Sequence, residues 1–110
     1  MKAKPLKLLD REYIECTTAE AEYIKLKFPS PANIIILPVI IKGRREGTNC
    51  WSWNGSVNSP TLMPSVKTQI DKPSGLIICH SWIKDGKVEF LLDSTHNNAG
   101  KTLDLLDIND

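Results

Sequence analysis

The dipeptide Asp85-Gly86 constrains the fold of this 110-residue chain more than any other feature of the sequence. It separates two runs rich in apolar and β-branched residues, Leu76–Ile83 and Lys87–Leu92, and an Asp-Gly pair in that position is a strong signal for a two-residue β-hairpin turn. Further short extended runs, broken by turn formers, are Glu22–Phe28, Ile34–Ile41, Trp51–Trp53, Val66–Ile70 and Lys101–Ile108. We therefore expect a mostly β fold, a single compact antiparallel sandwich or half-open barrel of six to eight short strands with little helix.

The predicted hairpin also determines which side chains share a face of the sheet. Counting outward from the turn, the pairs on the core face are Ile83 with Val88, Ser81 with Phe90 and Cys79 with Leu92. His80 and Trp82 lie on the opposite face, where Asp93 is a diagonal neighbour of His80. Because Cys79 and His80 are adjacent in a strand, their side chains point to opposite faces and cannot bind one metal ion without a bulge.

Composition and charge place the chain among small globular proteins. Hydrophobic residues make up 41% and charged residues 25%, which suits one soluble domain over residues 1–110. The formal net charge of +1 argues against a protein that coats extended nucleic acid by charge. Three widely spaced cysteines do not form a disulfide framework, and no apolar segment follows the basic start. We expect a cytoplasmic protein with no membrane association.

The longest apolar run, Ile34–Ile41, is too short to span a membrane and is rich in β-branched residues. We expect a strand buried on both faces. Pro38 places this strand at a sheet edge or a bulge, because proline cannot donate a ladder hydrogen bond. An apolar edge of this kind predicts a homo-oligomer formed through it.

His80, Asp93 and His96 are the side chains best suited to acid–base or metal chemistry. They suggest a metal-assisted hydrolase, with Glu89 as a candidate base. The simpler interpretation, which we favour, is that His80 caps a polar network and His96 hydrogen-bonds the backbone in a turn. Pro60-Thr61 and Pro64-Ser65 are interpreted as rigid β-edge segments whose hydroxyls cap the backbone. The sequence therefore predicts no catalytic residue.

A basic loop beside tryptophans indicates a different kind of site. Arg44 and Arg45 suit phosphate groups, and an indole can stack on a base. We expect at least one tryptophan to be buried in the core, and Trp82 to be the best exposed platform. The full predicted ligand-binding set is Arg44, Arg45, Trp51, Trp53, Asn54, His80, Trp82, Asp93 and His96.

Several motifs resemble a family of small bacteriophage and prophage proteins of unassigned function, often labelled "ammonia monooxygenase" automatically. They are Trp53-Asn54-Gly55, Pro60-Thr61, Pro64-Ser65, Cys79-His80-Ser81, Asp85-Gly86, and Asp93 and His96 before Ala99-Gly100. The likeness covers residues 29–106 and leaves 1–28 as a variable N-terminal segment.

The resemblance implies an ancestral zinc site. Many members carry a Cys-Pro-x-Cys turn, and here the corresponding stretch is Ser30-Pro31-Ala32-Asn33. Serine and asparagine are poor zinc ligands beside thiolate and imidazole, so we expect no cofactor, with zinc as the alternative. Cys79, His80 and His96 would then be the remnant of the site, and Cys50 is a substitute ligand.

The leading hypothesis from these features is a phage-encoded, non-enzymatic protein. It would capture a small anionic, nucleotide-like ligand or a host protein, to counter host defence. The metal-dependent hydrolase that uses His80, Asp93 and His96 is one alternative. A phage structural or assembly accessory protein is another.

Overall fold

The computed structural model describes residues 1–29, 34–41 and 50–108. Ten strands lie in these ranges: β1 (Ala3–Leu9), β2 (Glu12–Glu15), β3 (Tyr23–Lys27), β4 (Ile34–Ile40), β5 (Trp51–Trp53), β6 (Leu62–Met63), β7 (Val66–Lys72), β8 (Gly75–Lys84), β9 (Lys87–Phe90) and β10 (Thr102–Asp104). One 3₁₀ turn, η1 (Thr18–Glu20), is the helical element of the described residues. The predicted mostly β fold is confirmed.

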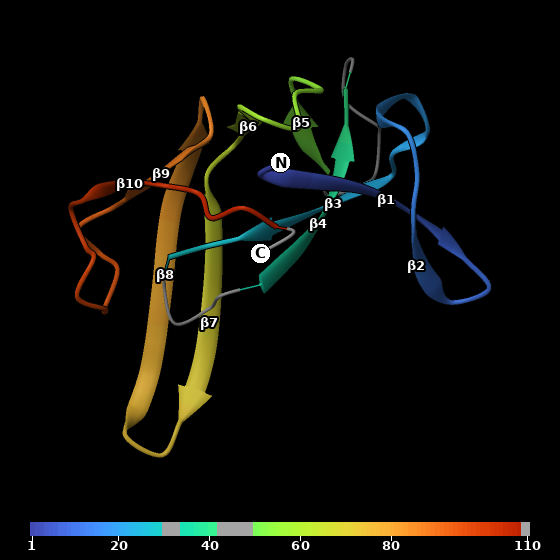
Figure 1. Ribbon diagram of the computed structural model, residues 1–110. Helices are drawn as coiled ribbons and strands as arrows, with labels where there is room; N and C mark the ends of the chain where they lie inside the picture. The colour runs from blue at the N-terminus through green and yellow to red at the C-terminus, as the bar shows by residue number, and fades with distance from the viewer. Residues whose placement is uncertain (30–33, 42–49, 109–110) are drawn as a thin grey trace.

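The strands form two sheets that share one core. The first sheet has the order β2-β1-β3-β4-β5-β6 and the second the order β10-β9-β8-β7 (Figure 1). The inner face of the first sheet contributes Ile24, Leu26 and Trp53 to the core, and the second contributes Val88 and Phe90, all 1% exposed or less. Burial of such side chains from both sheets is what holds a sandwich of this size together.

The strand count exceeds the predicted six to eight because of the N-terminal β1–β2 hairpin. Its turn is Asp10-Arg11, with φ angles of 51° and 66°. Both residues therefore occupy the left-handed region, which glycine and asparagine favour and arginine does not. A turn without glycine gives only a weak sequence signal, so the hairpin was not predicted.

The apolar strand β4 differs from its prediction in two ways. It lies inside the first sheet, antiparallel to β3 and parallel to β5 at Val39 and Ile40, so the expected edge position is wrong. Burial also alternates along the strand, with Ile35 and Leu37 in the core and Ile34 49% exposed. Pro38 is tolerated because Val39, the next residue, supplies the N–H that bonds the Glu22 carbonyl.

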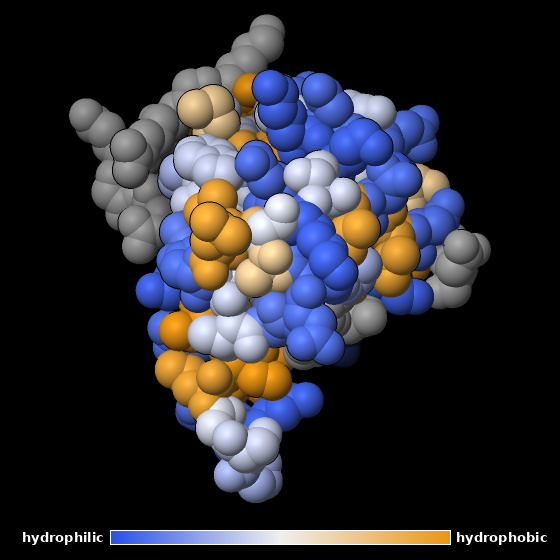
Figure 2. All heavy atoms as spheres, turned by 90° about the vertical axis from the view of Figure 1, so that its left-hand side faces the viewer, coloured by the Kyte–Doolittle hydropathy of each residue, from blue (hydrophilic) through white to orange (hydrophobic). Residues whose placement is uncertain are grey.

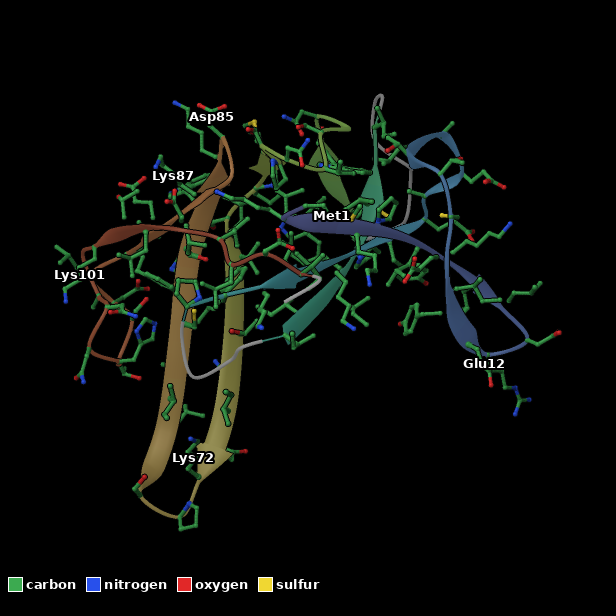
Figure 3. All side chains as sticks on the ribbon, in the orientation of Figure 1. Met1, Glu12, Lys72, Asp85, Lys87 and Lys101 are labelled. Atoms are coloured by element: carbon green, nitrogen blue, oxygen red, sulfur yellow. The ribbon has the colours of Figure 1, made fainter. Side chains whose placement is uncertain are left out.

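The β7–β8 hairpin is the longest pairing among the described strands, and its far end extends away from the other strands (Figure 1). Lys72 lies near this far end, and Asp85 lies at the opposite end of β8 (Figure 3). Apolar side chains gather on the surface over the far end of the hairpin (Figure 2), where Leu76 is 47% exposed. No helix among the described residues is long and apolar enough to cross a bilayer.

Candidate functional site

The chain passes from one sheet to the other at Pro64-Ser65. β6 pairs with β5 in the first sheet, whereas β7, which begins at Val66, pairs with β8 in the second. Leu62 and Val66 are each 1% exposed and fix the two sides of this crossing in the core. Ser65 lies between them and is half-buried, so its hydroxyl is held at the junction of the sheets within reach of solvent.

His80 lies on the outer face of the β8–β9 hairpin, as the sequence predicted. The observed pairs Ser81 with Phe90, Ile83 with Val88 and Lys84 with Lys87 match the predicted register. On the other side of β8, Val66 pairs with Ser81 and Lys67 with His80. Side chains alternate along β7, so Ser65, the residue directly before Val66, lies on the same outer face as Lys67 and His80. Ser65 is therefore a diagonal neighbour of His80.

Asp93 reaches this face from a turn rather than from a strand. β9 ends at Phe90, and the Ser94 N–H donates to the Leu91 carbonyl at 3.0 Å. The predicted pairing of Cys79 with Leu92 is wrong for this reason: the chain turns before Leu92, whose side chain is 85% exposed. The turn brings the Asp93 carboxylate against the imidazole of His80.

The three side chains form a continuous hydrogen-bonded chain. Ser65 Oγ lies 3.0 Å from His80 Nε2, and His80 Nδ1 lies 2.9 Å from Asp93 Oδ2 and 3.2 Å from Oδ1. The hydrogen bond from His80 lowers the pKa of the Asp93 carboxyl, so this carboxylate is ionised at neutral pH. An ionised carboxylate accepts the Nδ1 proton, which leaves the Nε2 lone pair facing the serine hydroxyl.

Backbone contacts hold this geometry in place. Ser94 Oγ accepts the His80 N–H at 3.0 Å and donates to the His80 carbonyl at 3.0 Å. On the serine side, Trp51 Nε1 donates to the Ser65 carbonyl at 3.3 Å. A serine whose hydroxyl meets a base, with the base oriented by a carboxylate, is the arrangement that activates serine as a nucleophile.

The structure separates the predicted metal ligands. His96 packs edge-on against Phe90, a core residue, with ring centroids 4.7 Å apart, while His80 lies on the outer face. Burial lowers the pKa of His96, and its Nε2 has no hydrogen-bond partner among the described residues. Cys79 is also in the core. Within the described residues no group of three histidine, cysteine or acidic side chains is placed to hold a metal ion.

The structure also separates the predicted ligand-binding residues: some have structural roles, and one is exposed on the outer face. Trp53 is 1% exposed, as expected for at least one tryptophan, and its indole N–H donates to the Ser56 carbonyl, so neither ring face is open to a base. Asn54 organises its loop, accepting from the Thr61 N–H and donating to the Ser59 carbonyl. Trp82 is 37% exposed on the outer face. Arg44 and Arg45, and the 30–33 stretch aligned with the Cys-Pro-x-Cys turn, lie outside the described residues.

A protein-family model described as "Bacterial ubiquitination-like system serine protease (BubE)" matches residues 35–91, just over half of the chain. The chain belongs to this family. The match to the BubE family includes Ser65 and His80 and ends two residues before Asp93. Neither the comparison with curated proteins nor that with solved structures finds a match. The phage resemblance stays a prediction.

Ser65 is the site residue that sequence reasoning missed. Pro64-Ser65 was interpreted as a structural edge, because the hairpin register covers only β8 and β9. The signal that would have found it is the pairing of β7 with β8, which puts Ser65 beside His80. Thr61, in the companion motif, does cap the backbone as predicted, since its Oγ1 accepts the Asp85 N–H at 2.9 Å.

Proposed function

We propose that this protein is a serine protease that cleaves peptide bonds with Ser65 as nucleophile, His80 as general base and acid, and Asp93 as the group that orients His80. The observation that carries the proposal is the hydrogen-bonded chain from Ser65 Oγ to His80 Nε2 and from His80 Nδ1 to Asp93. Membership of a family described as serine proteases supports the same assignment.

Acylation follows from the positions of these atoms. Ser65 Oγ attacks the carbonyl carbon of the scissile bond while its proton passes to His80 Nε2, 3.0 Å away. The imidazolium that results is stabilised by the Asp93 carboxylate. His80 then gives the proton to the leaving amine, the carbon–nitrogen bond breaks, and the acyl group remains as an ester on Ser65.

Deacylation uses the same groups in reverse order. A water molecule in place of the amine gives a proton to His80 Nε2 and attacks the ester carbonyl. The bond to Ser65 Oγ breaks, and the proton returns to that oxygen from His80. The His80 and Asp93 side chains are 24% and 59% exposed, so water reaches the site directly.

The substrate is proposed to be a protein of a bacterial ubiquitination-like system. The family description supports this class, because it places its members in such a system. Ser65 is half-buried at the junction of the two sheets and within reach of solvent, a position that an extended polypeptide can approach. This substrate class replaces the small anionic ligand as our leading hypothesis.

The proposal is tested with a fluorophosphonate, which phosphonylates activated serines and releases fluoride. We expect one adduct per chain by intact mass, mapped to Ser65 by peptide mass spectrometry. Ser65→Ala and His80→Ala should abolish labelling. Ser74→Ala, which removes an exposed serine in the β7–β8 turn, should label at the wild-type rate. Protein components of a ubiquitination-like system should be shortened by the wild-type protein and left intact by Ser65→Ala.

A folded wild-type protein that takes no label at Ser65, and shortens no such component, would contradict the proposal. The capture of a small anionic ligand by the Trp82 face would then become the leading alternative. Retained nucleotide seen by native mass spectrometry, lost on Trp82→Ala, would support that alternative.

A further inference from the structure

A cavity opens in the wall of the molecule where β6 and β8 separate. β7 pairs with β8 up to Val66 and Ser81, but among the described strands β6 pairs with β5 alone. At the far end the gap is closed by hydrogen bonds from Asp85 N to Thr61 Oγ1 and from Gly86 N to the Pro60 carbonyl, each 2.9 Å. Between these two closures lies a cavity of about 350 Å³.

The two segments that border the cavity lead to the Ser65 site. Met63 precedes Ser65 by two residues, and Trp82 follows His80 by two residues on the same face of β8. Residues two apart in a strand lie about 7 Å from each other. Trp82, in the cavity wall, therefore lies one side chain along β8 from the base, and Met63 is separated from the nucleophile in sequence by Pro64 alone.

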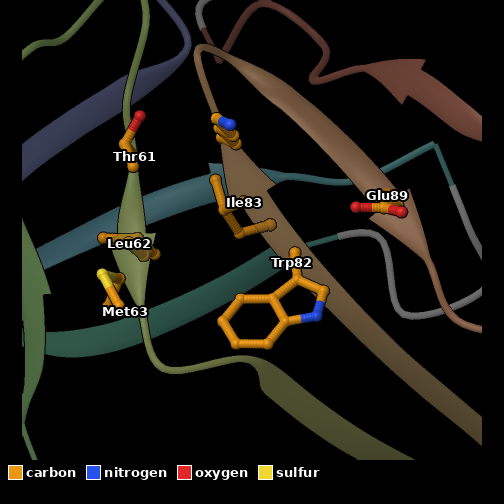
Figure 4. Close-up of a pocket in the computed structure, with 7 residues that line it drawn as sticks. Thr61, Leu62, Met63, Trp82, Ile83 and Glu89 are labelled. Carbon is orange, nitrogen blue, oxygen red and sulfur yellow. The ribbon is translucent and has the colours of Figure 1, made fainter.

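The surfaces around this cavity are mainly apolar (Figure 4). Leu62 and Ile83 are each 1% exposed and form a buried floor, whereas Met63 and Trp82 are 62% and 37% exposed and form the rim. The complete lining is Thr61, Leu62, Met63, Trp82, Ile83, Lys84 and Glu89.

The charged residues at the cavity favour neither a cationic nor an anionic ligand. Lys84 and Glu89 carry opposite charges and both are exposed, so they leave no net charge to attract an ion. A charged group set on the Leu62 and Ile83 floor would lose its hydration without a partner. The volume lies at the lower end of the range for ligand pockets and holds one large side chain better than a whole cofactor.

We propose that this cavity is the specificity pocket of the enzyme and takes the apolar side chain of a substrate residue that flanks the scissile bond. The inference rests on the proposed function, because it needs Ser65 to be the nucleophile. It adds what that function leaves open, namely which side chain is recognised and by which residues. Trp82 and Met63 are the specificity-determining residues.

Boronic acids of increasing size test the pocket without a known substrate. A boronic acid forms a tetrahedral adduct in which Ser65 Oγ bonds to boron and the serine proton passes to His80. The adduct places the substituent beside the nucleophile and protects Ser65 from the fluorophosphonate. The concentrations of methyl-, butyl- and 2-phenylethylboronic acid that halve the labelling rate are compared. We expect the larger two to protect at concentrations roughly 10-fold or more below that of methylboronic acid.

Variants assign this preference to the pocket. Trp82→Ala should reduce the ratio between phenylethyl- and methylboronic acid by about 5-fold or more, because the indole wall is lost. Trp82→Phe retains an aromatic wall and should recover most of the ratio. Leu76→Ala, which removes an exposed apolar side chain from the other end of β8, should keep the wild-type ratio. Trp82 is partly exposed, so its replacement leaves the core intact.

The outcomes separate the two proposals. If wild-type protein is labelled at Ser65 but the three boronic acids protect equally, the specificity pocket is refuted and the protease assignment stands. The same holds if Trp82→Ala keeps the wild-type ratio. If Ser65 is not labelled at all, both proposals fall together.

Discussion

Replacing Asp93 by asparagine exchanges one oxygen for a nitrogen and reverses the hydrogen bond that orients His80. In the wild-type protein the carboxylate accepts from Nδ1 through oxygens at 2.9 and 3.2 Å. An asparagine amide donates in the same position, so Nδ1 becomes the acceptor and the proton moves to Nε2. The nitrogen that faces Ser65 then has no lone pair to take the serine proton.

The expected loss of labelling rate in Asp93→Asn follows from what general-base catalysis contributes and from how exposed the Asp93 side chain is. Loss of the base is worth about 10²- to 10⁴-fold in rate, or about 3–5 kcal/mol of activation free energy. In serine proteases with a buried aspartate the same exchange costs about 10⁴-fold. Here the Asp93 side chain is 59% exposed, so the asparagine can rotate and present its oxygen to Nδ1 in part of the population. We expect a loss of about 10³-fold.

The assay is the second-order rate of fluorophosphonate labelling at Ser65. Asp104→Asn is the matched control, because Asp104, on β10, is also exposed and pairs with a cation, Lys87 Nζ, at 2.8 Å. The control should label within about twofold of wild type. An Asp93→Asn protein that is folded by circular dichroism and labels within about threefold of wild type would refute the assignment of Asp93.

Three other predictions concern the support of the site and the outer face of β4. Ser94→Ala leaves the His80 backbone N–H without its partner, so it should lower the free energy of unfolding in urea by about 2 kcal/mol and slow labelling. His80 lowers the pKa of Asp93, so this contact stabilises the fold above the ordinary carboxyl pKa and is lost as pH falls through the lowered one. Wild-type protein should therefore lose more thermal stability between pH 6 and pH 3 than Asp93→Asn does. Ile36→Lys, on the half-exposed face of β4, should shift any homo-oligomer to monomer in size-exclusion chromatography, and an unchanged elution volume would argue against that face as the seam.

The β8–β9 hairpin could be predicted from sequence because its information is local. An Asp-Gly turn with φ angles of 50° at Asp85 and 75° at Gly86 fixes the register of everything that follows it. That register correctly placed His80 and Cys79 on opposite faces, whereas the contact of Asp93 with His80 is made from the turn that follows β9. It failed at Leu92, because the end of a strand depends on the turn and on Gly100, whose N–H bonds the Phe90 carbonyl.

Ser65 could not be placed in the same way, because its position depends on where β7 pairs. The link between β7 and β8, Pro73-Ser74, has a weaker signal than Asp85-Gly86, and six pairs separate it from the pair of Val66 and Ser81. A shift of one residue in that register would turn Ser65 to the core face. Which of Trp51 and Trp53 is buried could not be predicted for a related reason, because it depends on how the two sheets pack, which no local pattern encodes.

The three site residues are close together in the sequence, and this determines which parts of the fold position them. Ser65 and His80 are 15 residues apart, and His80 and Asp93 are 13 apart, so all three lie in the contiguous stretch from the residue before β7 to the turn after β9. The first sheet supplies no member of the chain of hydrogen bonds and contacts it through the Trp51 indole at the Ser65 carbonyl. The second sheet therefore sets the distance between base and carboxylate, while the junction of the sheets sets the distance between nucleophile and base. Perturbation of the junction should move Ser65 relative to His80 without disturbing the contact between His80 and Asp93.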